Sequence, residues 1–162
     1  MTTLNIKFRR QIKPTDIEAI ERIVRSSGVF TSAEMEIALE LPEEKLDKGP
    51  ASSYEFLFAE DEKHILGYTC FGLIPMTSAS YDIYWIAVDE HLRGSGLGKK
   101  LMAKSEEIIK SLSGRRIYVE TSSRNPYRPT QNFYERCGYH REAVLNNFYA
   151  ESDSKIIYLK EL

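Results

Sequence analysis

The chain has 162 residues, of which 42% are hydrophobic, 28% charged and 11% aromatic. This composition excludes a disordered, collagen-like or coiled-coil chain and predicts a folded soluble protein with a single domain, residues 1–162. There are 22 Lys and Arg against 24 Asp and Glu, so the net charge of −2 gives no general attraction for nucleic acid or anionic lipid. We therefore expect neither nucleic acid nor a membrane among its partners.

The cysteine and histidine content also excludes classes of protein. Cys70 and Cys137 form no CxxC pair, and no His stands at the spacing of metal ligands. Neither a disulfide scaffold nor a metal site is expected. No apolar run is long enough for a signal peptide or a membrane span, so we expect a cytoplasmic protein.

Hydrophobic periodicity and turn residues predict eleven elements. In chain order they are a strand at 4–8, a helix from Thr15 to Gly28, a helix from Thr31 that Pro42 interrupts or restarts, an antiparallel hairpin of 54–59 and 65–73, a central strand at 81–88, a helix at 97–112, a strand at 116–121, a short helix at 130–137 and a strand pair at 143–150 and 155–159. Thr15 with Glu18 and Thr31 with Glu34 match the capping-box pattern at the start of a helix. The strand, helix and strand within 81–121 predict a crossover unit, and hence at least one parallel pair in an otherwise antiparallel sheet.

The most informative segment is a glycine-rich loop between the central strand and the following helix, with the sequence Arg93-Gly94-Ser95-Gly96-Leu97-Gly98. Free backbone N–H groups and the positive end of the helix dipole converge there, so the loop predicts a site for a phosphate. Arg93 can add a charge-assisted contact. The loop does not match the nucleotide P-loop, because Lys99 is followed by Lys100 rather than by Ser or Thr. It does not match the dinucleotide fingerprint either, because Lys99 stands where the third glycine belongs.

The loop resembles the coenzyme A motif of the GNAT superfamily of N-acetyltransferases. That motif has Arg or Gln, two residues, Gly, one residue and then Gly or Ala, and Arg93, Gly96 and Gly98 fill these places. Downstream, the segment from Phe133 to Tyr139, with the sequence FYERCGY, resembles the family's Phe-Tyr-Glu-x-x-Gly-Phe segment. The resemblance implies a single N-acetyltransferase domain with an α+β fold: a mixed, mostly antiparallel sheet of about seven strands with one splayed parallel pair, flanked by about four helices.

The resemblance also assigns a cosubstrate and its binding residues. The pyrophosphate of acetyl-CoA would bind the amides of the glycine loop, which comprises Arg93, Gly94, Ser95, Gly96, Leu97 and Gly98. The pantetheine arm would pair with the strand end formed by Ile86, Ala87 and Val88. The Val88 amide would stabilise the oxyanion of the thioester carbonyl. The Asn that contacts coenzyme A in the family corresponds to Asn125. The spacing differs, because Asn125 lies nine residues before Tyr134 and the family has seven. Tyr127 and Arg128 are alternative residues for lining the site.

Catalytic roles follow from the same resemblance. Tyr134 would protonate the departing thiolate of coenzyme A. Two carboxylates are candidates for the general base: Asp82 matches the strand carboxylate of the histone-acetylating branch, and Glu120 with Asn125 matches the branch that acetylates protein N-termini. The sequence leaves the choice between them open.

The expected reaction is transfer of an acetyl group from acetyl-CoA to a primary amine by direct attack. A small molecule or an amino acid is the first choice of acceptor, and a protein N-terminus or a lysine is the alternative. A non-catalytic coenzyme A binding module is a second class of function that the glycine loop alone does not exclude. Homodimers are common among GNAT relatives, so a second copy of the chain is a further candidate partner.

Overall fold

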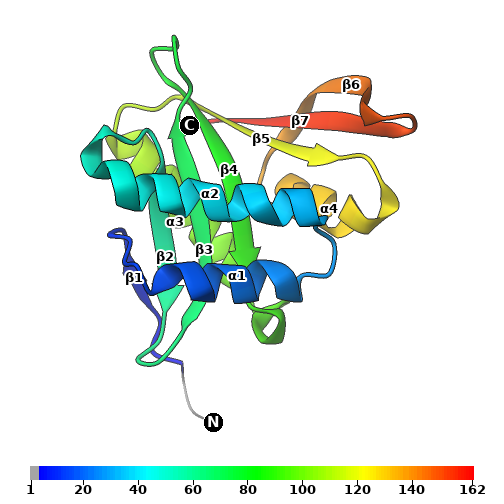
Figure 1. The fold of residues 1–162 in the computed structure, drawn as a ribbon. Coiled ribbons are helices and arrows are strands. Elements are labelled where there is room, and N and C mark those ends of the chain that lie inside the picture. The colour runs from blue at the N-terminus through cyan, green and yellow to red at the C-terminus, as the bar shows by residue number, and fades with distance from the viewer. Residues whose placement is uncertain (1–3) are drawn as a thin grey trace. The chain divides into compact units, whose positions relative to one another are not determined.

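The computed structural model describes residues 4–162, which form seven strands and four α-helices (Figure 1). The helices are α1 (Asp16–Ser26), α2 (Ser32–Lys48), α3 (Leu97–Ser111) and α4 (Arg128–Arg136). The strands are β1 (Lys7–Arg9), β2 (Glu55–Glu60), β3 (Ile65–Leu73), β4 (Ser80–Val88), β5 (Arg116–Ser122), β6 (His140–Ala150) and β7 (Asp153–Glu161). The predicted order of strands and helices is confirmed.

The strands follow one another in the sheet as β1-β2-β3-β4-β5-β7-β6. The pairs β1–β2, β2–β3, β5–β7 and β6–β7 are antiparallel, whereas β4 and β5 are parallel. The parallel register joins Ser80–Asp82 to Arg116–Tyr118 and does not continue to the next two residues of β4, although both strands run on. The predicted mixed sheet with one parallel pair and four helices is therefore confirmed.

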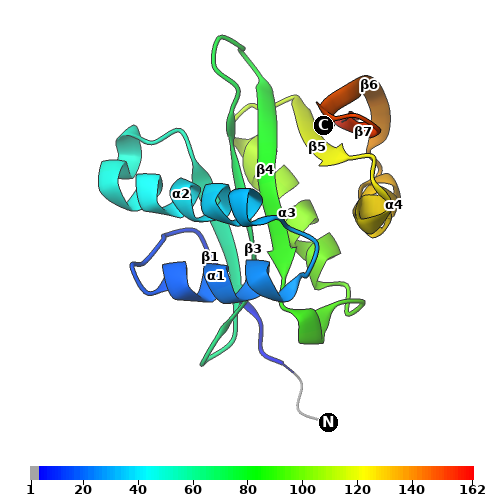
Figure 2. The same cartoon turned by 45° about the vertical axis from the view of Figure 1, so that its right-hand side comes forward.

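The chain divides into two compact units, and β4 and α3 each contribute to both. The first unit contains the residues up to Gly72 together with Trp85–Ser105. Its two N-terminal helices run side by side across β2 and β3 (Figures 1 and 2). The helix α1 buries Ile20, Ile23 and Val24, and the rings of Phe56, Phe58 and Tyr68 stack on the strands beneath.

A buried ion network joins the start of α1 to the first strands. The Arg9 guanidinium lies 2.9 Å from carboxylate oxygens of Asp16 and of Glu60, and the side chain of Asp16 is only 4% exposed. The Asp16 carboxylate also accepts a hydrogen bond of 2.7 Å from the backbone amide of Lys13. Because two acids on different elements share one cation, the network fixes α1 against β1 and β2.

The two predicted capping boxes have different outcomes. At Thr31 the box is present: its hydroxyl accepts from the Glu34 amide, and the Glu34 carboxylate accepts from the Thr31 amide. At Thr15 the prediction was wrong, because Thr15 has helical dihedral angles and makes no capping hydrogen bond.

The predicted break at Pro42 was also wrong. The helix α2 runs through this residue, and both Pro42 and Ala38, one turn earlier, are buried by packing.

The second unit contains Leu73–Tyr84 and Glu106–Leu162. On one face of β5 and β7, the ring of Tyr134 from α4 packs against Tyr139 and Tyr158 at centroid distances of 6.1 and 5.8 Å. The Tyr139 hydroxyl donates to Glu106, which also binds the ammonium of Lys160. This aromatic and ionic cluster positions α4 on the sheet.

Several predicted boundaries shift by a few residues. The first strand is Lys7–Arg9 rather than 4–8, and β6 and β7 are longer than predicted.

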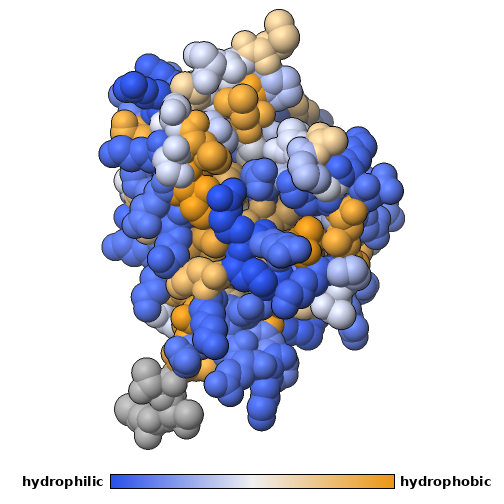
Figure 3. Space-filling view, turned by 90° about the vertical axis from the view of Figure 1, so that its left-hand side faces the viewer, coloured by the Kyte–Doolittle hydropathy of each residue, from blue (hydrophilic) through white to orange (hydrophobic). Residues whose placement is uncertain are grey.

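Among residues 4–162, no helix is both long and apolar enough to cross a lipid bilayer. On the face drawn in Figure 3, hydrophobic side chains are interspersed with hydrophilic ones.

Candidate active site

The glycine loop that joins β4 to α3 has the backbone geometry of an anion cradle. Gly94 and Gly96 have φ angles of +77° and +87°, which side-chain-bearing residues rarely adopt, and the space that a Cβ would occupy at either is open within 4 Å. Within residues 4–162, the amides of Gly94, Gly96, Gly98 and Lys99 have no hydrogen-bond acceptor. Four free donors at the N-terminus of a 15-residue helix suit a phosphate group.

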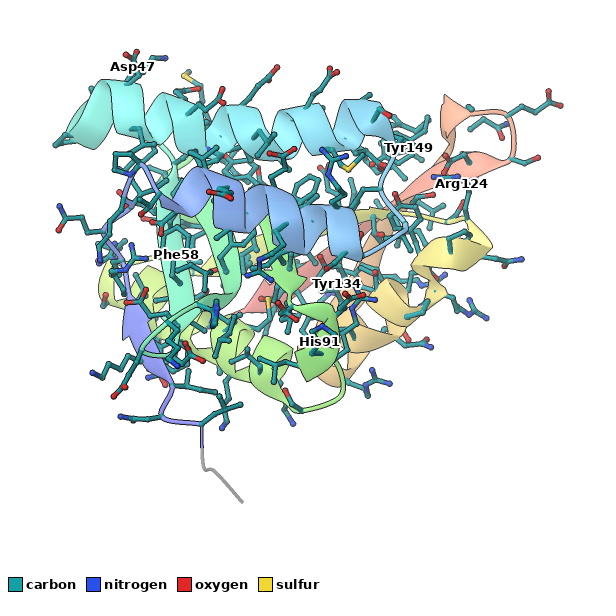
Figure 4. The ribbon with its side chains drawn as sticks, turned by 60° about the horizontal axis from the view of Figure 1, so that its bottom comes forward. Asp47, Phe58, His91, Arg124, Tyr134 and Tyr149 are labelled. Carbon is teal, nitrogen blue, oxygen red and sulfur yellow. The ribbon has the colours of Figure 1, made fainter. Side chains whose placement is uncertain are left out.

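The loop is anchored to α1 at two points. Arg93 donates to the Ser26 carbonyl at 3.3 Å, so its guanidinium is engaged by protein. Asp89, at the start of the loop, accepts from the side chain of Arg22 and from the amide of His91, a residue labelled in Figure 4. Burial opposes ionisation of Asp89, but these hydrogen bonds prevail and lower its pKa.

The strand end that precedes the loop packs closely against β3. A Cβ on Gly67 would lie 3.0 Å from the Ala87 carbonyl oxygen, 3.0 Å from Leu101 and 3.3 Å from Val88. A side chain at this position would require its neighbours to shift by a few tenths of an ångström. Ala87 is buried, whereas Ile86 and Val88 are partly exposed, so this end of β4 combines a fixed backbone with accessible side chains.

The two candidate bases come together in the second unit. Asp82 pairs in register with Tyr118, and Glu120 lies two residues further along β5, on the same face of the sheet. Burial, together with the charge of Glu120, raises the pKa of Asp82 to about 6, while Lys155 acts in the opposite direction. Glu120 is 45% exposed and forms an ion pair of 3.0 Å with the ammonium of Lys155.

Tyr134, labelled in Figure 4, comes from α4. By strand register and its contact with Tyr158, it lies on the opposite face of the sheet from the two carboxylates. It packs against Tyr158 of β7. Tyr158 lies three residues after Lys155 on this strand, so the two side chains point to opposite faces of the sheet. Tyr134 as a whole is 6% exposed, and no residue within 4–162 forms a hydrogen bond with its hydroxyl. Burial raises the pKa of Tyr134, so the phenol keeps its proton near neutral pH, as a proton donor must.

The loop after β5 carries Asn125, Tyr127 and Arg128, the three candidates for lining the site. Asn125 and Arg128 are exposed, whereas Tyr127 is buried at 5% and its ring lies 5.3 Å from the guanidinium carbon of Arg124. The Asn125–Tyr127 segment forms a single 3₁₀ turn that leads into α4.

The structure thus places the predicted cofactor residues of 86–98 in the first unit and Asp82, Glu120, Asn125 and Tyr134 in the second. Three further residues belong to these sites and were not predicted: Arg22 and Ser26, which anchor the loop, and Lys155, which binds Glu120. No local pattern marks these contacts, because each joins elements that are far apart in the chain.

Comparisons with known proteins identify one family and several structures of the same fold. The profile of the family described as "Acetyltransferase (GNAT) family" matches residues 18–139. The chain is 44% identical to a protein from Desulfovibrio desulfuricans assigned to the GNAT family of acetyltransferases; the match covers 96% of this chain and 98% of that one, with a TM-score of 0.94. No curated protein matches the sequence.

More distant structures share the fold alone. An aminoglycoside 6'-N-acetyltransferase in complex with coenzyme A is 18% identical, with a TM-score of 0.73 and 96% of each chain covered. The PaiA N-acetyltransferase from Thermoplasma acidophilum, also in complex with coenzyme A, is 17% identical, with a TM-score of 0.76 and 98% of this chain and 100% of that chain covered.

Proposed function

The chain belongs to the GNAT family of acetyltransferases, and from that premise we propose that it transfers an acetyl group from acetyl-CoA to a primary amine of a small molecule or amino acid. The observation that carries the proposal is the set of four unpartnered amides around Gly94 and Gly96. These donors suit the pyrophosphate of coenzyme A, and two structures of the same fold contain that molecule.

The proposed reaction needs no covalent enzyme intermediate. The neutral amine attacks the thioester carbonyl carbon, a carboxylate removes the proton from nitrogen, and the C–S bond breaks as the C–N bond is completed. The Val88 amide stabilises the oxyanion, and Tyr134 donates its proton to the leaving thiolate. The end of the β4–β5 register at Asp82 supports this arrangement, because a ligand that pairs with a strand needs backbone groups that a neighbouring strand does not use.

A thiol-release assay with acetyl-CoA tests the cosubstrate and the acceptor together. The acceptors to be tested are polyamines, amino acids, aminoglycosides and short peptides. Calorimetry with coenzyme A and with ATP accompanies the assay and measures binding. We expect release with a small amine and heat only from coenzyme A. Release with peptides alone would identify a protein N-terminus or lysine as the acceptor. Binding of coenzyme A without release for any amine would leave a binding module.

A further inference from the structure

Three charged residues share one face of the sheet in the second unit. Asp82 on β4 is in register with Tyr118 of β5, and Glu120 follows two residues later. Lys155 on β7 is in register with Ser122, the next residue of β5 on that face. Lys155 reaches back along this face and places its ammonium 3.0 Å from Glu120.

An irregularity in β6 fixes the position of this ammonium. Between the pairs Leu145–Lys155 and Ala150–Asp153, β6 has four residues where β7 has one. Asn147 in this bulge has a φ angle of +55°, and its side-chain carbonyl accepts a hydrogen bond of 2.9 Å from the Ser152 amide.

The bulge presents two aromatic rings to Lys155. The Lys155 ammonium lies 3.9 Å from the ring centroid of Phe148 and 5.8 Å from that of Tyr149. Its side chain is only 15% exposed. A cation held by an aromatic face and a carboxylate at once has little freedom to move, so the ion pair with Glu120 is persistent.

The two carboxylates consequently differ in their partners. The Glu120 carboxylate is engaged by the Lys155 ammonium at 3.0 Å. Asp82 has no hydrogen bond or ion pair within the described residues 4–162, and it is half-buried. The groups that face it in its unit are Tyr118 and Glu120 from β5, Lys155 from β7 and Tyr84 of its own strand.

We propose that Lys155 is a positioning residue, which keeps Glu120 in an ion pair and so leaves Asp82, one of the two carboxylates that the family resemblance offers as general base, to take the amine proton. This inference rests on the proposed acetyl transfer. In each turnover one proton passes from the amine nitrogen to a carboxylate oxygen of Asp82 and then to solvent. The thiolate receives a separate proton from Tyr134, and the phenolate of Tyr134 then takes a proton from solvent, so the turnover balances.

The test is the pH profile of kcat in the full chain, with an amine identified by thiol release, for Asp82→Asn, Glu120→Gln, Lys155→Met and Lys155→Arg. We expect Asp82→Asn to lose about 100-fold in kcat, while Glu120→Gln stays within about fivefold of the parent. The acid limb should move to lower pH in Glu120→Gln, which removes a like charge, and to higher pH in Lys155→Met, which removes the cation, by about one pH unit each. Lys155→Arg should restore the parent profile.

Lys160→Met is the matched control. Lys160 lies on the opposite face of β7 and pairs with Glu106 at 2.9 Å, so its loss should leave the acid limb in place. Loss of turnover in Glu120→Gln with retention in Asp82→Asn would overturn the proposal. An acid limb that does not move in Lys155→Met would overturn the role of Lys155.

A second measurement separates this inference from the proposed function. Titration of the Asp82 carboxyl carbon by NMR needs no substrate. It should show a higher pKa in Lys155→Met and a lower one in Glu120→Gln than in the parent. If no amine supports turnover but these shifts appear, the acetyl transfer fails while the coupling of the three charges stands. If the Asp82 carboxyl titrates alike in all three proteins, the coupling is refuted, whatever the activity.

Discussion

The guanidinium of Arg93 donates a hydrogen bond to the Ser26 carbonyl, so the first residue of the glycine loop is tied to the last turn of α1. The loop sequence alone predicts that this side chain contacts the phosphate. In the structure it stabilises the loop that carries the phosphate-binding amides. Arg93 therefore contributes to coenzyme A binding in part by holding the loop in one conformation.

Arg93→Ala should raise the Kd for acetyl-CoA by about fivefold to tenfold, because one hydrogen bond to a charged donor is lost and the free loop becomes more mobile. Calorimetry with acetyl-CoA measures the change. Arg25→Ala is the control, since Arg25 is exposed near the same end of α1 and pairs only with Glu21 among the described residues. An unchanged Kd in Arg93→Ala would show that the anchor is dispensable.

Gly96→Ala should weaken coenzyme A binding by at least about tenfold and lower the free energy of unfolding by about 1 kcal/mol. The positive φ of +87° strains any side-chain-bearing residue, and the new methyl group would enter the open space in front of the amides. Gly28→Ala separates the two effects, because Gly28 also has a positive φ, +70°, and open space but lies outside the loop. Denaturant titration should show a similar loss of stability in both variants, with affinity lost only in Gly96→Ala.

The contrast between the two Thr-x-x-Glu segments shows where local sequence is sufficient and where it is not. The same pattern forms a capping box at Thr31 and none at Thr15. The difference lies in Asp16, whose carboxylate binds the Lys13 amide and the side chain of Arg9. Arg9 is in turn held by Glu60 of β2, 51 residues away in the chain, so the segment around Thr15 does not contain all of the information.

The same reasoning applies to the site. The glycine loop is predictable because all of its chemistry lies within six consecutive residues, 93–98, that follow a β-rich segment. The hairpin of β2 and β3 is predictable because both strands are apolar and a short polar turn separates them. The ion pair of Glu120 with Lys155 is not, because it depends on the β5–β7 register and on the bulge in β6.

Tyr134→Phe should reduce kcat by about 100-fold and leave the melting temperature unchanged, because within the described chain the Tyr134 hydroxyl makes no hydrogen bond that stability would need. Tyr139→Phe provides the opposite pattern. Its hydroxyl donates to Glu106 at 3.1 Å, so this variant should lose about 1 kcal/mol of stability and keep its turnover. Thiol release and thermal unfolding of both variants measure the two effects. Equal turnover in Tyr134→Phe and the parent would remove Tyr134 from the mechanism.

Asp82→Asn should stabilise the fold at alkaline pH. The pKa of Asp82 is raised to about 6 in the folded chain, so the folded state binds its proton more tightly than the unfolded state does. Ionisation of Asp82 therefore lowers stability as the pH rises from about 4 through 6, and the penalty is complete above about pH 7. Because the side chain is only half-buried, solvent screening reduces this penalty to about 1 kcal/mol.

The neutral amide of Asn carries no such penalty, so Asp82→Asn should be more stable than the parent at pH 8, and the gain should fall by more than half at pH 4.5. Asp61→Asn is the control of opposite sign: hydrogen bonds from the amides of Lys63 and His64 lower the pKa of Asp61. Its ionised form stabilises the fold, so this variant should be less stable than the parent at pH 8 and approach it in acid. Urea unfolding at the two pH values measures both differences. A gain in Asp82→Asn that is as large at pH 4.5 as at pH 8 would mean that the charge of Asp82 is not its cause.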